Sequence, residues 1–117
     1  MSAVGSGMGS RRLGVTRSTA GDGVIRLIVS GEVDIGTVDQ LRDAITTVLD
    51  EPGVGGLLLD FDPLRFLDSS GIAALIAGYH TARQRGAGFG VCNCHGTVRN
   101  VLEVTGVYEV LAAGDQA

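Results

Sequence analysis

The chain has 117 residues, 44% of them hydrophobic, with 13 acidic and 9 basic side chains and a formal net charge of -4. This length supports one domain with an ordinary hydrophobic core and excludes two such cores. The basic residues are all arginines, scattered rather than gathered into a stripe, so we expect no nucleic acid partner.

The opening residues, 1–11, are rich in Gly and Ser and show no periodicity, which predicts a flexible tail before a single domain over residues 12–117. They lack the apolar stretch of a secretory signal, and no later run approaches the roughly 18 apolar residues of a membrane span. We therefore expect a cytoplasmic protein with no membrane partner, in which Cys92 and Cys94 are reduced thiols.

The first predicted elements are two strands and a helix. "LGVTRS" (13–18) predicts an edge strand and "VIRLIVSG" (24–31) a second strand, joined as a hairpin by the turn "TAGDG". Thr37 and Gln40 then stand at the spacing of a capping box, which predicts the start of a helix that ends at "DEPG". Its apolar side chains recur at steps of three and four, as one buried face requires: Val38, Leu41, Ile45, Val48 and Leu49.

The middle of the chain predicts a buried strand and a longer helix. "GGLLLDFD" (55–62) is an unbroken apolar run, typical of a strand covered on both faces, and residues 63–67 connect it to a helix over 70–85. That helix ends before Gly86. Its predicted apolar stripe consists of Ile72, Leu75, Ile76 and Tyr79.

The last third predicts a strand in "GFGVCNC" (88–94), a short helix that begins near Thr97 and ends at Gly106, and a final strand in "VYEVL" (107–111). Strands that alternate with helices indicate an α/β fold whose strands are largely parallel beyond the first pair.

Three stretches suggest chemistry, and each has an ordinary structural interpretation. Asp68, Ser69, Ser70 and Gly71 form "DSSG", and Asp and Ser are preferred residues at helix starts, so the motif alone predicts only that. "DSSG" also lacks the first glycine of a hydrolase G-x-S-x-G elbow. The glycine strings "GSGMGS" and "GAGFGV" do not follow strands and contain no G-K-[ST], which argues against a nucleotide cradle.

A metal site and a phospho-aspartate site are two further candidates, and each lacks residues that its chemistry requires. Cys92, Cys94 and His95 lack a second pair of ligands at zinc spacing, so we predict neither a metal nor another cofactor. Asp60 and Asp62 end a strand, where a phospho-aspartate site could stand. That chemistry would also need paired acids for Mg²⁺ and a lysine, and the chain contains no lysine.

The ordered series "SGEVDIGTVDQL", "GLLLDFDPLRFLDSSGIAALI", "GFGVCN" and "VLEVTGVYEVL" resembles the STAS domain, and within it the bacterial anti-sigma factor antagonists. The resemblance covers about residues 13–111 and is more specific as a set than in any one piece. It implies a single α/β domain with a four- to five-stranded mixed sheet, α-helices packed against that sheet, and no enzymatic activity.

In such proteins the first hydroxyl of the motif is phosphorylated by a partner anti-sigma factor that is a GHKL-type serine kinase, and a PP2C-type phosphatase removes the phosphate. The unphosphorylated form binds the anti-sigma factor and releases the sigma factor. Carried over, the resemblance implies Ser69 as the phosphorylation site, Asp68 as the acid that helps present it, Ser70 as the helix cap and Gly71 as the small residue that allows close approach.

Glu32 and Asp34 lie where the resemblance places acidic residues near the partner surface. For Asp34, whose carboxylate precedes a helix, a role in the turn and helix start is an equally good interpretation. STAS domains also serve as accessory subunits of lipid-transport ATPases and as modules of signalling complexes without a phospho-switch, and this is the alternative function.

Overall fold

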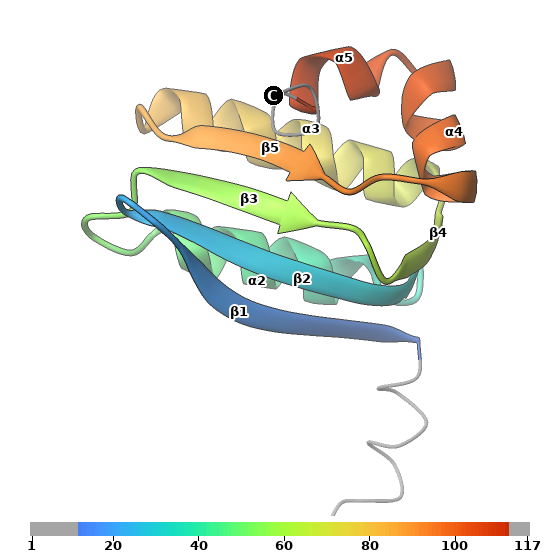
Figure 1. Ribbon diagram of the computed structural model, residues 1–117, viewed down its shortest axis with the longest axis horizontal. Coiled ribbons are helices and arrows are strands. Elements are labelled where there is room, and N and C mark those ends of the chain that lie inside the picture. The colour runs from blue at the N-terminus through green and yellow to red at the C-terminus, as the bar shows by residue number, and fades with distance from the viewer. Residues whose placement is uncertain (1–11, 113–117) are drawn as a thin grey trace, which may run out of the picture.

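A five-stranded mixed sheet organises residues 12–112, the part of the chain that the computed structural model describes. The strands are β1 (Leu13–Gly21), β2 (Val24–Val33), β3 (Gly56–Asp60), β4 (Leu64–Leu67) and β5 (Gly88–Cys92). The helices are α2 (Val38–Leu49), α3 (Ser69–Gln84), α4 (Gly96–Val104) and α5 (Val107–Leu111). The strand order is β1-β2-β3-β5, with β4 also paired to β2 (Figure 1).

The strand directions confirm the predicted α/β arrangement. β1 and β2 form the antiparallel hairpin, and its turn places Asp22 and Gly23 at positive φ. The pairs β2 with β3, β3 with β5 and β2 with β4 are all parallel. Because parallel strands end at the same edge, the loops after β2, β3, β4 and β5 gather at one edge of the sheet.

The helices α2 and α3 lie side by side behind the sheet in Figure 1 and cover one of its faces. The predicted buried face of α2 is confirmed, since the five apolar residues expected there are its buried residues. The opposite face of the sheet is more open: Leu58 is only half-buried, and burial alternates along β2. The prediction that the "GGLLLDFD" strand is covered on both faces is therefore wrong for that face.

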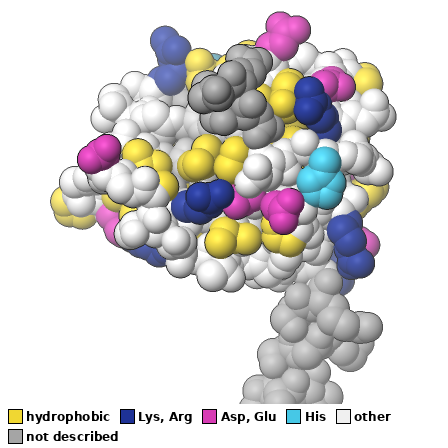
Figure 2. All heavy atoms as spheres, viewed as in Figure 1, with side chains coloured by type: hydrophobic (Ala, Val, Ile, Leu, Met, Phe, Trp, Pro, Cys, Tyr) yellow, Lys and Arg dark blue, Asp and Glu magenta, His cyan; other side chains and the backbone are white. Residues whose placement is uncertain are grey.

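Figure 2 shows the surface from the same side as Figure 1, with acidic, basic and apolar side chains interspersed on it.

The buried side of α3 differs from the predicted stripe because small residues pack it. Ile72 and Leu75 are buried as expected, whereas Ile76 is 40% exposed. A Cβ on Gly78 would lie 2.8 Å from Cζ of Phe89, which leaves no room for a larger side chain at that contact. The helix therefore turns its small residues inward and leaves part of the bulky stripe in solvent.

Residues 107–111 form the helix α5, so the prediction of a final strand is wrong. Gly106 has a φ of 79° and reverses the chain after α4. Val107, Tyr108 and Leu111 are buried, a spacing that suits one turn of helix. The carbonyl oxygen of Leu111 would lie 2.9 Å from a Cβ on Gly90, so α5 packs against β5.

Residues 64–67 were expected to be a connection but form β4. The pairing of β3 with β2 ends at Asp60 opposite Ile28, and β4 continues along β2 from Gly31 to Val33. The two short strands thus follow one another along β2, with a brief crossing between them. β4 leads directly into α3.

The helix α2 begins where it was predicted but without the expected capping box. The Thr37 hydroxyl accepts from the backbone N–H of Asp34 at 3.0 Å and donates to the carbonyl of Glu32 at 3.0 Å. The Gln40 amide donates instead to the carbonyl of Leu13, at 3.3 Å. Both side chains fasten the helix start to neighbouring strands.

Candidate functional site

The loops after β2 and β4 bring most of the predicted site residues together. Val33 and Leu67 are the last paired residues of these parallel strands, and the N–H of Asp68 donates to the carbonyl of Val33 at 3.1 Å. The turn 34–37 and the segment 68–71 therefore start from adjacent points at the same edge of the sheet. Glu32 lies just before them on β2, opposite Phe66 on β4.

Asp68 is the N-cap of α3. Its backbone is extended, and its Oδ1 accepts from the N–H of Ser70 at 2.9 Å and from that of Gly71 at 3.4 Å. The same oxygen accepts from the Ser70 hydroxyl at 2.5 Å. The prediction that Ser70 caps the helix is therefore wrong, because Ser70 lies inside the first turn and its hydroxyl donates to the cap.

Ser69 is the first residue of α3 and its side chain is exposed. Within residues 12–112 its hydroxyl makes no hydrogen bond, in contrast to that of Ser70. Gly71 behind it is buried, and a Cβ there would lie 2.9 Å from Cγ1 of Val33 and would also collide with Leu67. The glycine allows the start of α3 to pack directly against β2 and β4. The backbone at Ser69 is therefore fixed by packing, while its side chain is exposed.

Asp34 organises the turn before α2. Its Oδ1 accepts from the N–H of Gly36 at 2.9 Å, and its other carboxylate oxygen pairs with the guanidinium of Arg12. Its carbonyl accepts from the N–H groups of Thr37 and Val38, at 3.0 and 2.8 Å. Desolvation alone would raise the pKa of Asp34, but the Gly36 N–H, Arg12 and the Thr37 hydroxyl together lower it. This geometry supports a role of Asp34 in the turn and the start of α2. A contact between Asp34 and a partner is a proposal, made below.

A buried polar cluster at the end of β3 was not predicted. Asp60 is 7% exposed, and its Oδ2 accepts from Nη2 and Nε of Arg26, at 2.8 and 3.1 Å. Its Oδ1 accepts from the Asn93 amide and from the N–H of Asp62, both at 3.0 Å. Desolvation would raise the pKa of Asp60, but these hydrogen bonds and the Arg26 charge bring it below the usual range. Both oxygens are occupied, so Asp60 is not presented as a phospho-acceptor.

Cys92 and Cys94 are buried near the end of β5, where thiols pack as small apolar side chains. Nε2 of His95 lies 2.6 Å from the carbonyl oxygen of Asp62, in the next loop along the same edge. In the described part of the chain, no group of three or more His, Cys, Asp and Glu side chains converges as metal ligands would. No helix among residues 12–112 is long and apolar enough to span a bilayer.

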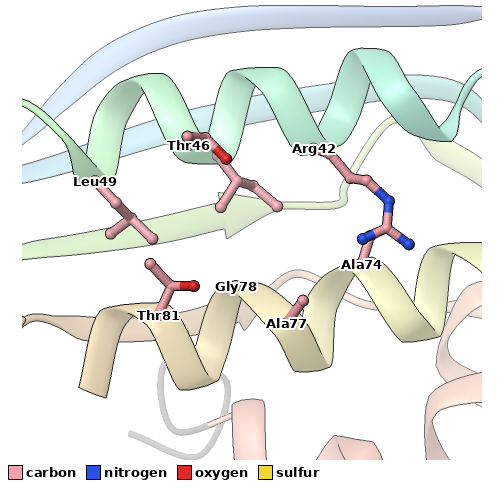
Figure 3. Close-up of a pocket in the computed structure, with 8 residues that line it drawn as sticks. Arg42, Thr46, Leu49, Ala74, Ala77, Gly78 and Thr81 are labelled. Atoms are coloured by element: carbon pink, nitrogen blue, oxygen red, sulfur yellow. The ribbon is translucent and has the colours of Figure 1, made fainter. Parts of the chain in front are cut away.

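The pocket between α2 and α3 is a weaker candidate (Figure 3). It has a volume of about 130 Å³ and is floored by small side chains of α3 such as Ala74 and Ala77. Among the described residues that line it, Arg42 is the one titratable side chain. A single cation offers no acid and base pair for catalysis.

The fold and the motif place the chain in a known family: the STAS domain model matches residues 17–115, and the chain belongs to that family. The chain is 27% identical over 93 residues, 80% of each sequence, to a protein of Paenibacillus polymyxa named anti-sigma F factor antagonist.

Two solved structures are similar to the chain over most of its length. An anti-sigma factor antagonist from Mycobacterium paratuberculosis superposes with a TM-score of 0.75 at 27% identity, over 86% of this chain and 84% of that one. The anti-sigma factor antagonist SpoIIAA in its unphosphorylated form gives 0.73 at 22% identity, over 84% and 85%. These comparisons confirm the resemblance and the mixed-sheet fold predicted from the sequence.

Removing the Asp68 side chain tests the cap. We expect Asp68→Ala to lower the free energy of unfolding by about 0.5 to 2 kcal/mol, because two backbone N–H groups of α3 lose their acceptor. Ser70→Ala should cost less, since Asp68 keeps its bonds from both N–H groups. Urea unfolding of the two variants checks this, and a larger loss for Ser70→Ala would contradict the assignment of the cap.

Proposed function

We propose that this protein is an anti-sigma factor antagonist and that it binds its partner through the Ser69 surface, which comprises Glu32, Asp34, Asp68, Ser69, Ser70 and Gly71. One observation carries the proposal: Ser69 is exposed at the capped start of α3. The chain belongs to the STAS family, and a relative is named anti-sigma F factor antagonist. The protein acts by binding, without a catalytic centre or cofactor of its own, and works in the cytoplasm.

The partner is an anti-sigma factor that is also a GHKL-type serine kinase. It transfers the γ-phosphoryl group of its own Mg²⁺-bound ATP to Oγ of Ser69, which loses its proton while ADP is released. A PP2C-type phosphatase hydrolyses the phosphate ester and restores the binding form. The unphosphorylated protein occupies the anti-sigma factor and so releases the sigma factor.

The environments of the two serines favour Ser69 as the acceptor. The Ser70 hydroxyl is half-buried and donates to Asp68 at 2.5 Å, so it would have to break that bond to react. The Ser69 hydroxyl is exposed and has no competing acceptor among the described residues. A kinase can therefore reach Ser69 without disturbing the cap.

The phosphate would act on the interface and leave the fold intact. It adds about -1.5 to -2 charge at neutral pH. The first turn of a helix tolerates that charge, because its N–H groups carry partial positive charge. The acidic residues of the Ser69 surface lie in adjacent segments at the same edge of the sheet, so a phosphate there makes close docking costly through repulsion and desolvation.

The test is phosphorylation in vitro. The protein is incubated with a purified GHKL-type anti-sigma factor of the same organism and Mg²⁺-ATP, and its intact mass is measured. We expect one phosphate on the wild type and on Ser70→Ala, and none on Ser69→Ala. Phosphate on Ser69→Ala would contradict the site. An unmodified wild type that instead co-purifies with a membrane ATPase, regardless of Ser69→Ala, would support the alternative of a transporter or signalling subunit.

A further inference from the structure

Five large apolar side chains are exposed among residues 12–112, and one stands apart from the rest. Three of them lie on helices: Ile76 on α3, Val104 on α4 and Val110 on α5. Phe66 lies on β4 and is 40% exposed. Ile35 is 82% exposed and occupies the turn between β2 and α2.

Ile35 lies at the same end of the sheet as Ser69. Val33 and Leu67 are paired in parallel register, Ile35 is two residues beyond Val33, and Ser69 is two residues beyond Leu67. The hydrogen bond of 3.1 Å from the Asp68 N–H to the Val33 carbonyl ties the two segments where they leave the strands. The exposed isoleucine and the exposed serine thus lie in adjacent segments at one edge of the sheet.

Isolated apolar side chains are common on protein surfaces, but this one is held in place. The turn around Ile35 is fixed by the Asp34 carboxylate on the Gly36 N–H and by its ion pair with Arg12. Thr37 adds bonds to Asp34 and to the carbonyl of Glu32. A β-branched side chain on a fixed turn has little freedom left to lose on docking. The same bonds order the start of α2, and they hold the exposed Ile35 in a fixed position although Ile35 itself is not part of the core.

We propose that Ile35 is the apolar anchor of the Ser69 surface and that it inserts into an apolar pocket with a basic rim on the anti-sigma factor. The inference rests on the proposed function. The basic rim follows from charge complementarity, because Glu32, Asp34 and Asp68 place three carboxylates at this edge of the sheet and, within residues 12–112, only that of Asp34 is paired with an arginine, Arg12. Interfaces of this kind concentrate their binding energy in a few buried apolar side chains within a polar rim.

The anchor also gives the phospho-switch a physical basis. Seating Ile35 brings the neighbouring Ser69 close to the partner and strips water from it. The neutral hydroxyl loses little in that step, whereas a phosphate would have to be desolvated beside the carboxylates of its own surface. Phosphorylation therefore blocks the step that seats the anchor.

The experiment measures binding of variants to a purified GHKL-type anti-sigma factor loaded with Mg²⁺-ADP, by isothermal titration calorimetry. Ile35→Ala should weaken binding by about 10-fold, and Ile35→Asp by about 100-fold or more. The control is Val104→Asp, which changes a side chain that is 79% exposed on α4 and should bind as the wild type does. Melting curves of all variants should match the wild type, because neither side chain is part of the core.

The outcomes separate the anchor from the proposed function. If Ile35→Asp binds like the wild type while Ser69→Asp does not, the anchor is overturned and the proposed function stands. If Val104→Asp loses as much affinity as Ile35→Asp, the effect is general and the anchor is also overturned. A wild type that binds none of the GHKL-type anti-sigma factors of its organism would overturn both.

Discussion

Replacing Asp60 with alanine is expected to destabilise the protein by about 2 to 4 kcal/mol, because it removes the centre of a buried polar cluster. The change leaves the Arg26 guanidinium, the Asn93 amide and the Asp62 N–H without the carboxylate that accepts from all of them. Urea unfolding checks the loss. Glu103→Ala is the control, since its exposed pair with Arg99 on α4 should contribute no more than about 0.5 kcal/mol.

The same carboxylate should make stability depend on pH in a defined direction. The pKa of Asp60 is lowered in the fold, so its contribution is present above the ordinary aspartate value of about 3.9 and is lost as the pH falls through the lowered value. Asp60→Asn should therefore be less stable than the wild type at neutral pH, and the difference should shrink in strong acid. A difference that stays constant from pH 7 to pH 2 would contradict this assignment.

The sequence predicts those elements whose signal is local and repeated. The buried face of α2 follows from apolar residues at steps of three and four, and all five are buried in the fold. The hairpin turn at Asp22 and Gly23 follows from residues that adopt positive φ easily. The parallel strand pairs beyond the first hairpin follow from the alternation of strands and helices.

The errors arise where tertiary contacts decide between local alternatives. Residues 107–111 are a short apolar run, which suits a strand or one helical turn equally, and the packing of Leu111 on Gly90 selects the helix. The four residues of β4 have no strand signal of their own and are ordered by pairing with β2. The resemblance implies Ser70 as the cap of α3, whereas Asp68 caps the helix in the structure; both residue types are common caps, so residue type alone does not decide between them.

The site divides in the same way. The segment 68–71 is contiguous, so its place at the start of a helix could be predicted from the sequence. In the cluster around Asp60, Arg26 is 34 positions away in the sequence and Asn93 is 33 positions away. No spacing in one sequence reveals contacts between residues so far apart. Ile35 carries no signal in the sequence, because an isolated apolar residue in a turn belongs to no pattern, and its exposure follows only from the fold.

Ser69→Asp is expected to weaken binding to the anti-sigma factor by about 100-fold or more while leaving the melting temperature nearly unchanged. Ser69 is exposed and lies in the first turn of α3, where a negative charge is tolerated by the helix dipole. The same charge at the interface meets the neighbouring acidic side chains and must be desolvated, and like charges that are brought together cost several kcal/mol. Titration calorimetry and thermal unfolding on the same samples separate the two effects.

Two variants sharpen this prediction. Ser69→Ala should bind as the wild type does, because the hydroxyl makes no hydrogen bond within the described residues. Thr47→Asp adds the same charge at an exposed position in the second half of α2, away from the helix start at this edge, and should leave binding unchanged. A loss of binding in Thr47→Asp would attribute the effect to net charge alone, and a collapse of the fold in Ser69→Asp would show that the segment 68–71 serves stability first. Binding lost only in Ser69→Asp, on an intact fold, requires that the charge acts where the partner sits.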